Sequence, residues 1–303
     1  MRWLYGGAGR CLTFVMKTLQ QMGEHAAIAA LTANLKAVGD DCAVLPMDET
    51  YDLVLTSDPL IENVHFTHDA TPEQIGHKAI CRVLSDFAAM GAEPQYLLIN
   101  VVAPPDQNFQ TLEKIYVEFS NLWKKYGAEV VGGDLAQGPV LELHVFGTGR
   151  VPKGTARLRS GAQPGDCIYV TGPLGGAQAS GKHLNFEPRL DWGNALRESG
   201  VVTSMMDISD GLATDLRHIL KASGVGAELF SEKVPTLGKI ESALYDGEDF
   251  ELLFTAPEGV KLPTLGNDKQ AVIQWLGKIT DRQEELLLDG APLAGKAFEH
   301  FRQ

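Results

Sequence analysis

Cysteine and cationic residues are scarce in this chain. Its 303 residues include four cysteines, and none of them forms a Cys-x-x-Cys pair. This argues against a disulfide framework or a zinc knuckle, and we expect free thiols in a reducing cytoplasm. Lysine and arginine total 26, against 39 aspartate and glutamate residues, for a formal net charge of -13. Because nucleic-acid binding relies on cationic side chains, this balance argues against a nucleic-acid partner.

Long apolar runs are also lacking. No run approaches the roughly 20 residues that span a bilayer, so we expect no membrane segment. Residues 1–15 lack the apolar core and the cleavage site of a signal peptide, and they fit no periodic element. We therefore expect residues 1–22 to be an N-terminal extension, either disordered or translated from a mis-assigned start upstream of Met16.

Alternating helix and strand patterns predict a mixed α/β (α+β) fold. Apolar residues recur at helical spacing in residues 24–35, 77–90, 109–126 and 211–222. Short apolar runs typical of strands occupy residues 42–45, 53–55, 96–102, 130–131, 141–147, 167–170, 226–230 and 250–255, with a terminal pair in 271–289. A turn-rich joint follows residue 150, and each half carries its own apolar core pattern. We predict an N-terminal domain over residues 23–150 and a C-terminal domain over residues 151–303.

Six apolar runs end at an aspartate or an Asp/Glu pair. The motifs are Gly39-Asp40-Asp41, Thr56-Ser57-Asp58, Leu84-Ser85-Asp86, Gly132-Gly133-Asp134, Met206-Asp207-Ile208-Ser209-Asp210 and Gly247-Glu248-Asp249. Each could be a turn if taken singly. Carboxylates that converge in a fold repel one another unless hard cations such as Mg²⁺ neutralise them, and Mg²⁺ in turn holds phosphates. Together the motifs predict magnesium-dependent phosphate chemistry.

Other local patterns leave alternatives open. Residues 176–183 nearly match a phosphate-binding loop, but His183 stands where a hydroxyl should bind Mg²⁺, which favours an ordinary flexible loop. Ser209 or Asp210 could cap the helix predicted after them, or the aspartates could bind metal while the helix N-terminus holds phosphate.

Two single residues also have two interpretations. His65 is either packed beside Phe66 or in contact with a substrate. Arg159 is either a solvated charge or a phosphate ligand. Taken alone, each position favours the first interpretation.

The order of the motifs is far more specific than any one of them. The chain contains, in sequence, GDDCAVL, TSDPLIENVHF, KAICRVLSDFAAMGAEP, VVGGD, RSGAQPGD with YVTG, DISDGLATDL and ALYDGEDFELLFT. Over residues 23–301 this series closely resembles the thiamine-monophosphate kinase family, of the aminoimidazole ribonucleotide synthetase and selenophosphate synthetase superfamily. The resemblance implies a two-domain fold and a homodimer formed through the N-terminal sheet. The implied reaction transfers the γ-phosphoryl group of ATP to thiamine monophosphate, the final step of thiamine diphosphate biosynthesis.

The resemblance also implies roles for individual residues. The metal ligands of the family fall on Asp41, Thr56, Ser57, Asp58, Asp86, Asp134, Asp207 and Asp210. Its ATP contacts fall on Gly133, Asp134, Arg159 and Ser209. Its substrate contacts fall on His65, Glu248 and Phe298. Several Mg²⁺ ions are implied, and K⁺ stays open as an additional cation.

The implied chemistry needs no catalytic nucleophile. The acceptor phosphate, with a second pKa of about 6, is already ionised near neutral pH, so no general base is required. We predict direct in-line transfer by positioning and electrostatics. Three departures from the family are Pro59 in place of a common threonine, a short stretch at residues 182–188, and the N-terminal extension. None of them deletes a matched ligand.

Two rival functions remain. One is another enzyme of the same superfamily with a different acceptor, although the motifs around Asp86 and Asp210 fit the kinase better. The other is a non-catalytic sensor of a nucleotide or a thiamine phosphate, which would be expected to have lost a ligand.

Overall fold

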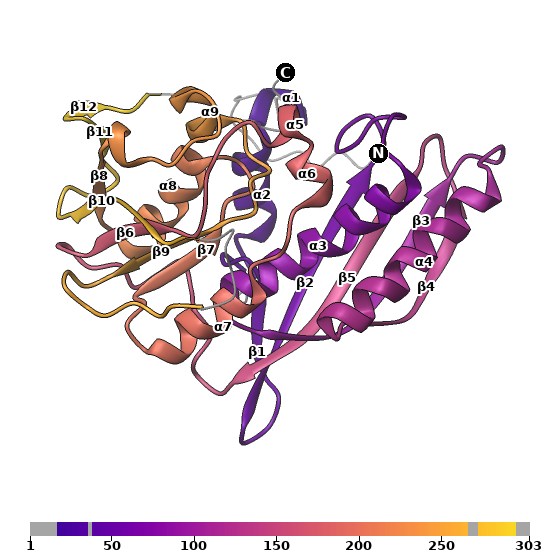
Figure 1. Cartoon of the computed structure of the whole chain (residues 1–303), viewed down its shortest axis with the longest axis horizontal. Helices are drawn as coiled ribbons and strands as arrows, with labels where there is room; N and C mark the ends of the chain where they lie inside the picture. The colour runs from indigo at the N-terminus through magenta and orange to yellow at the C-terminus, as the bar shows by residue number, and fades with distance from the viewer. Residues whose placement is uncertain (1–16, 36–37, 266–271, 295–303) are drawn as a thin grey trace, which may run out of the picture. The chain divides into compact units, whose positions relative to one another are not determined.

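The computed structural model describes residues 17–35, 38–265 and 272–294 (Figure 1). The chain divides into two compact units, one of residues 1–36 with 299–303 and one of residues 37–298. The described part of the first unit, residues 17–35, contains two helices, α1 (Leu19–Met22) and α2 (Glu24–Thr32). The helix predicted over residues 24–35 is thus confirmed, with an earlier end. No helix in the described ranges is long and apolar enough to cross a membrane.

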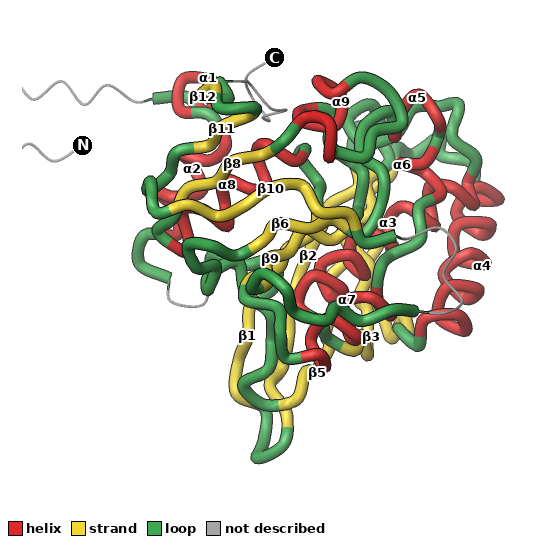
Figure 2. Tube along the Cα trace, turned by 60° about the vertical axis from the view of Figure 1, so that its left-hand side comes forward, coloured by secondary structure: helices red, strands yellow, loops and turns green. Residues whose placement is uncertain are grey.

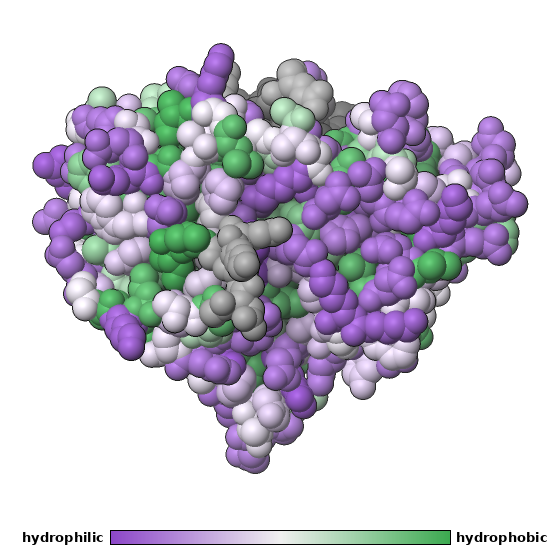
Figure 3. Space-filling model, in the orientation of Figure 1, coloured by the Kyte–Doolittle hydropathy of each residue, from purple (hydrophilic) through white to green (hydrophobic). Residues whose placement is uncertain are grey.

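A five-stranded sheet forms the first half of the second unit. Its strands are β1 (Ala43–Pro46), β2 (Tyr51–Ile61), β5 (Glu142–Pro152), β3 (Glu93–Ala103) and β4 (Glu129–Gln137), in that spatial order. Within this sheet β3 and β4 pair in parallel, and the other neighbouring strands pair antiparallel. Helices α3 (Pro72–Met90) and α4 (Phe109–Tyr126) cover one face (Figure 1). Hydrophilic residues dominate the surface over α4 in Figure 3.

Local sequence signals define both ends of α3. Thr71 and Gln74 form a capping box, and Pro72 supplies the fixed φ that suits the first turn. Gly91 ends the helix in the left-handed conformation, as the sequence predicted. A side chain at Gly91 would also lie 2.7 Å from Arg197 Cβ, so packing against the next domain requires glycine there too.

A seven-stranded sheet forms the second half, with order β12-β11-β8-β10-β6-β9-β7. Its strands are β6 (Cys167–Val170), β7 (Ser204–Asp207), β8 (Gly226–Leu229), β9 (Leu252–Ala256), β10 (Gln274–Thr280), β11 (Leu286–Leu288) and β12 (Ala291–Pro292). The helices are α5 (Ala177–Ser180), α6 (Lys182–Asn185), α7 (Leu190–Ser199), α8 (Leu212–Ser223), the 3₁₀ turn η1 (Ser231–Lys233) and α9 (Ile240–Tyr245).

The larger apolar core extends from one sheet to the other. Met205 of β7 and Phe254 of β9 belong to the same cluster as Phe87 of α3. Their chain neighbours Met206 and Leu253 belong to a second cluster that includes α8. Because side chains alternate along strands, one face of the seven-stranded sheet therefore packs toward α3 and the other toward α8. Helix α3 lies between the two sheets (Figure 2).

Two predictions about local structure need correction. The motif Gly132-Gly133-Asp134 forms no turn, because it lies inside the edge strand β4, which continues to Gln137. Residues 176–183 form neither a phosphate-binding loop nor a flexible loop. They contribute to two four-residue helices, α5 and α6, and Lys182 pairs with a carboxylate of the protein itself.

That carboxylate belongs to Glu251, which is fully buried. Arg189 donates to it through Nε at 2.7 Å and Nη2 at 2.8 Å. Lys182 Nζ and Thr171 Oγ1 each donate at 2.8 Å. Burial acts to raise the pKa of Glu251, but Arg189 and Lys182 outweigh it and hold that pKa below its ordinary value. The network fixes the loop that follows β6 against the strand that begins at Leu252.

Glu251→Ala should destabilise the fold by about 3–5 kcal/mol, because it leaves the buried Arg189 and the partly buried Lys182 without their carboxylate. Urea unfolding followed by circular dichroism measures the change. The matched control is Glu258→Ala, which breaks the exposed pair with Lys278 and should cost less than about 1 kcal/mol. Equal unfolding midpoints for the two variants would contradict this interpretation of the network.

Candidate functional site: a carboxylate cluster beside helix α3

Four of the predicted metal ligands come together. Asp41 precedes β1, Asp58 lies on β2, Asp86 on α3 and Asp207 at the end of β7. All four carboxylates act electrostatically on the thiol of Cys42, whose pKa is raised by burial and then by these charges. The strands and the helix of both domains therefore converge on one acidic cluster.

Burial and mutual repulsion disfavour the charged forms of these carboxylates. Burial, followed by the charges of Asp58 and Asp207, raises the pKa of Asp86 well above its ordinary value. Burial and the charge of Asp41 raise the pKa of Asp207 to about 7. Asp215 of α8, which the sequence analysis did not select, has its pKa raised by burial and by Asp210. A site of this kind favours the binding of cations.

A polar stripe on α3, defined by Lys78, Arg82, Ser85 and Asp86, holds the cluster in place. Arg82, Ser85 and Asp86 follow Lys78 by four, seven and eight positions, so all four side chains share one face of the helix. Ser85 Oγ donates to Asp207 Oδ2, and Asp86 Oδ2 accepts from Thr56. The stripe therefore contacts residues of both domains.

Arg159 closes the cluster from the joint between the domains. Its Nη2 donates to Asp41 Oδ1 at 2.6 Å, and its backbone N–H donates to Asp40 Oδ1 at 2.7 Å. Arg159 is thus an ion-pair partner within the site and not a solvated charge. Asp40, which matched no ligand of the family, holds the backbone of Arg159 in place.

Two predicted substrate contacts are joined by a residue that the sequence analysis missed. Lys78 is fully buried, and its Nζ donates to Glu248 Oε1 and to His65 O, each at 2.6 Å. The Nδ1 atom of His65 accepts from Ile61 N at 2.9 Å, so a neutral imidazole carries its proton on Nε2. A lysine amid the apolar residues of α3 was the available signal, because a buried lysine requires a partner.

The loop that contains Glu248 is fixed to the loop after β7. Glu248 N donates to Ser209 O at 2.7 Å, and Phe250 N donates to Ile208 O at 2.8 Å. Glu248 and Phe250 both have positive φ, 57° and 51°, which is strained for residues with a side chain. This geometry places the predicted substrate contact Glu248 beside Ser209 and Asp210.

Of the two alternatives for Ser209 and Asp210, capping of the following helix is wrong. The N-cap of α8 is Gly211, and no side chain caps it. Instead, Asp210 N donates to Asp215 Oδ2 at 3.0 Å. Capping therefore does not explain the two side chains.

Other predicted residues lie apart from the cluster. Ser57 is on the opposite face of β2 from Thr56 and Asp58, because side chains alternate along a strand. Asp134 is on edge strand β4, three strands from Asp58, or about 14 Å at the usual spacing. Phe298 lies outside the described residues.

Gly133 and Asp134 line a groove between α4 and β4 with a volume of about 630 Å³. Tyr116, Phe119 and Trp123 of α4 form its other wall. A side chain at Gly133 would lie 1.8 Å from Ile99 O, so the strand can approach β3 this closely only with glycine there. No local sequence signal marks Tyr116, since its exposure beside Gly133 depends on the packing of α4.

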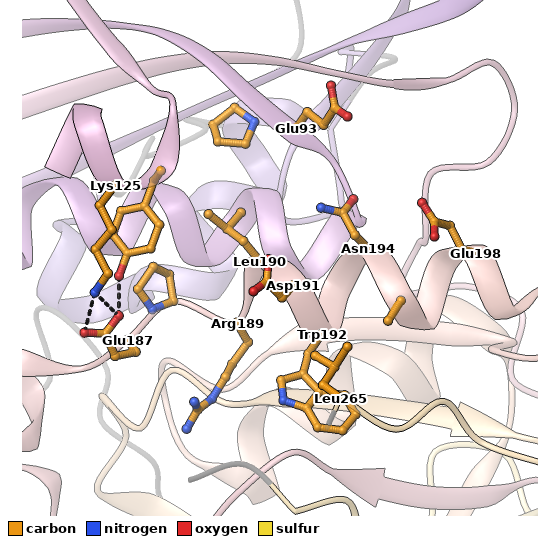
Figure 4. Close-up of a pocket in the computed structure, with 14 residues that line it drawn as sticks. Glu93, Lys125, Glu187, Arg189, Leu190, Asp191, Trp192, Asn194, Glu198 and Leu265 are labelled. Carbon is orange, nitrogen blue, oxygen red and sulfur yellow. Dashed lines mark hydrogen bonds and ion pairs between the residues drawn. The ribbon is translucent and has the colours of Figure 1, made fainter. Parts of the chain in front are cut away.

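A second cavity, of about 980 Å³, contains none of the predicted site residues (Figure 4). Lys125 and Tyr126 hydrogen bond to Glu187 on one side of it, while Asn194 and Glu198 project from α7 on the other. Arg189 lines this cavity but pairs with Glu251. We therefore place the candidate site at the carboxylate cluster.

The donor set suits Mg²⁺. Within the described residues no three His, Cys, Asp or Glu side chains are grouped closely enough to hold one ion by themselves. Mg²⁺ is usually bound by one or two carboxylates together with water and substrate phosphates, so it does not need such a group. Asp41 Oδ2 is buried and makes no hydrogen bond with the described atoms, which leaves an oxygen suited to a cation.

Comparison with known proteins defines the class. Residues 39–151 match the family model "AIR synthase related protein, N-terminal domain", and residues 163–281 match the corresponding C-terminal domain. The chain is therefore an AIR synthase related protein, which confirms the expected two-domain fold.

Individual relatives narrow the class further. The thiamine-monophosphate kinase of Escherichia coli K12 is 36% identical, over 87% of this chain and 91% of that protein. The thiamine-monophosphate kinase of Aquifex aeolicus is 32% identical, over 93% and 99%. The solved structure "AaThiL complexed with AMPPCP and TMP" aligns with a TM-score of 0.86 and 30% identity, over 95% of this chain and all of that one. This chain belongs to the thiamine-monophosphate kinase family.

Without divalent cations, thermal stability should fall as the pH rises from about 5 to about 8. The folded-state pKa values of Asp41, Asp86 and Asp207 are raised, so the folded protein binds more protons than the unfolded chain and loses stability as they dissociate. The loss begins near the ordinary value of 3.8 and continues through about 7 for Asp207. Mg²⁺ should therefore raise the Tm more at about pH 8 than at about pH 5.

Scanning calorimetry in EDTA or in Mg²⁺ measures both effects. Asp207→Asn should flatten the pH dependence, whereas Asp106→Asn, in an exposed turn, should leave it unchanged. If Asp207→Asn followed the wild-type slope, the carboxylate would not be titrating in this range.

Proposed function

We propose that this protein transfers the γ-phosphoryl group of ATP to thiamine monophosphate, giving thiamine diphosphate and ADP. The observation that carries the proposal is the convergence of Asp41, Asp58, Asp86 and Asp207 in a chain of this kinase family. Attack of one phosphate on another gathers negative charge, which only cations can offset. The acidic cluster and its expected Mg²⁺ ions meet that requirement.

The carboxylates differ in their expected tasks. We assign Asp41, Asp58, Asp86 and Asp207 to the metal ions, with Asp210 extending the set toward Glu248. Mg²⁺, when bound, would neutralise phosphate oxygens and fix their positions. Thr56 assists by holding Asp86. The side chain of Ser57 belongs to the opposite face of β2, so we assign no metal ion to it, and K⁺ remains a second candidate cation.

The other polar residues bind and orient the two substrates. Arg159 lies beside Asp41, where its guanidinium can pair with an ATP phosphate. Ser209 accepts from Glu248 N through its backbone carbonyl, and we assign its hydroxyl to the phosphate chain of ATP. His65 and Glu248, which both accept hydrogen bonds from Lys78, form the end of the site that binds the thiamine heterocycles. Because the acceptor phosphate is already ionised, these residues need only align it with the donor.

Asp210→Asn should lower kcat by about 100-fold or more while leaving Tm close to wild type, because Asp210 does not cap α8. The assay measures thiamine diphosphate and ADP formed from ATP, Mg²⁺ and thiamine monophosphate. Asp106→Asn is the control and should keep full activity. Wild-type protein that forms neither product would refute the proposed function. Normal turnover by Asp210→Asn would exclude only that aspartate as a ligand.

We also propose a homodimer formed through the open face of the five-stranded sheet. Tyr96, Leu98 and Phe146 are exposed on that face, with Leu98 directly opposite Phe146. Val131 extends the apolar surface to the edge strand. Isolated proteins rarely expose contiguous apolar patches of this kind. A second copy would also let Asp134 and the α4/β4 groove serve the partner's site, which would account for a predicted ligand that lies far from Asp58.

Wild-type protein should therefore have twice the mass of the chain by light scattering, and Leu98→Glu should shift it toward the monomer, because a charge would be buried at the interface. Val117→Glu, at an exposed position of α4, is the control and should remain dimeric. A monomeric wild type would rule out the dimer without affecting the proposed reaction.

A further inference from the structure

Arg82 lies midway along the polar stripe of α3. Its Nη1 donates to Pro59 O at 2.9 Å, and its Nη2 donates to Asp58 Oδ1 at 3.4 Å. Its Nε lies 3.3 Å from Asp58 Oδ2 but makes no hydrogen bond with the described atoms. A guanidinium has five N–H groups, so Arg82 keeps donors that these contacts do not use.

The contacts of Arg82 are looser than those of the other cations at the site. Lys78 is fully buried and pairs with Glu248 at 2.6 Å, and Arg159 pairs with Asp41 at 2.6 Å. The side chains of Arg82 and Asp58 are 15% and 28% exposed. Arg82 is therefore accessible to a ligand while being partly shielded from water, which strengthens its interaction with an anion.

The helix places Arg82 between the two ends of the site. Four residues of α-helix separate Lys78 from Arg82 and Arg82 from Asp86, which is about 6 Å along the axis in each case. Lys78 marks the end with Glu248, and Asp86 lies in the carboxylate cluster. A ligand that extended along α3 from the first end to the second would pass Arg82.

The proposed reaction restricts where the acceptor phosphate can lie. For in-line transfer, its attacking oxygen must approach the transferred phosphorus to about 3–3.5 Å. The transferred group is held at the carboxylate cluster, so the acceptor phosphate belongs at the border of that cluster on the Glu248 side. Arg82 stands at this border.

We infer that Arg82 binds the phosphate of thiamine monophosphate, an inference that rests on the proposed function. The guanidinium exchanges its long contacts with Asp58 for bidentate contacts with phosphate oxygens, a geometry that arginine satisfies better than lysine. The same exchange frees the Asp58 carboxylate. Binding of the acceptor phosphate thereby makes Asp58 available to a cation.

The test compares thiamine monophosphate with thiamine, which lacks the phosphate. Arg82→Met should raise the KM for thiamine monophosphate by about 10- to 100-fold. The KM for ATP and the inhibition constant of thiamine should stay within about 2-fold, since neither involves this contact. Arg82→Lys should recover part of the loss because it keeps the charge. Arg282→Met, at an exposed arginine of the C-terminal domain, is the control and should behave as wild type.

Calorimetric titration in Mg²⁺ without ATP supplies a readout that does not depend on turnover. Arg82→Met should bind thiamine monophosphate about 10- to 100-fold more weakly and thiamine as wild type does. Thiamine monophosphate affinity that is unchanged in a folded Arg82→Met protein would overturn the inference. So would an equal loss for both ligands, which would mean that Arg82 only maintains the site. A wild type without kinase activity would refute the proposed function, while the titration would still decide whether Arg82 recognises the phosphate.

Discussion

Helix α3 can be buried between two sheets only because each polar side chain on its stripe has a partner. An unpaired lysine or serine there would lose its hydrogen bonds to water without replacement, a cost of several kcal/mol. Lys78 and Ser85 find their partners in the second domain, at Glu248 and Asp207. The same contacts that make burial of α3 tolerable therefore fix the relative positions of the two halves of the site.

This arrangement stabilises the fold less than an apolar interface would. Asp86 and Asp207 are held where burial opposes their ionisation, and Glu248 is held in a strained backbone conformation. Such features persist only where the surrounding structure enforces them. The Glu251 network supplies that rigidity, because it anchors the segment that follows Glu248 without contacting the carboxylate cluster. The strained residue Glu248 and the anchoring residue Glu251 thus lie a few positions apart in the chain.

Local sequence signals predicted the helices and strands well. The site was predicted less completely, because its residues are brought together by long-range contacts. Helix α4 spans the residues over which apolar side chains recur at helical spacing, because Asn108 caps its start and Gly127 terminates it. Strand β4 was underestimated, since the turn preference of Gly132-Gly133-Asp134 was overridden by pairing with β3. The order of the aspartate motifs identified the family. Lys78 was missed because its partner Glu248 lies 170 residues away.

Pro59, where the family resemblance implies a threonine, is accommodated by the geometry of β2. In a strand, the N–H and C=O of one residue point to the same side. The carbonyl of Pro59 accepts from Arg82, so the N–H that proline lacks would have pointed toward the same side, away from β5. Strand β1 pairs with β2 only as far as Leu55, so no ladder bond is lost there. The substitution thus leaves Asp58 on its strand, and its carbonyl helps to position the guanidinium of Arg82.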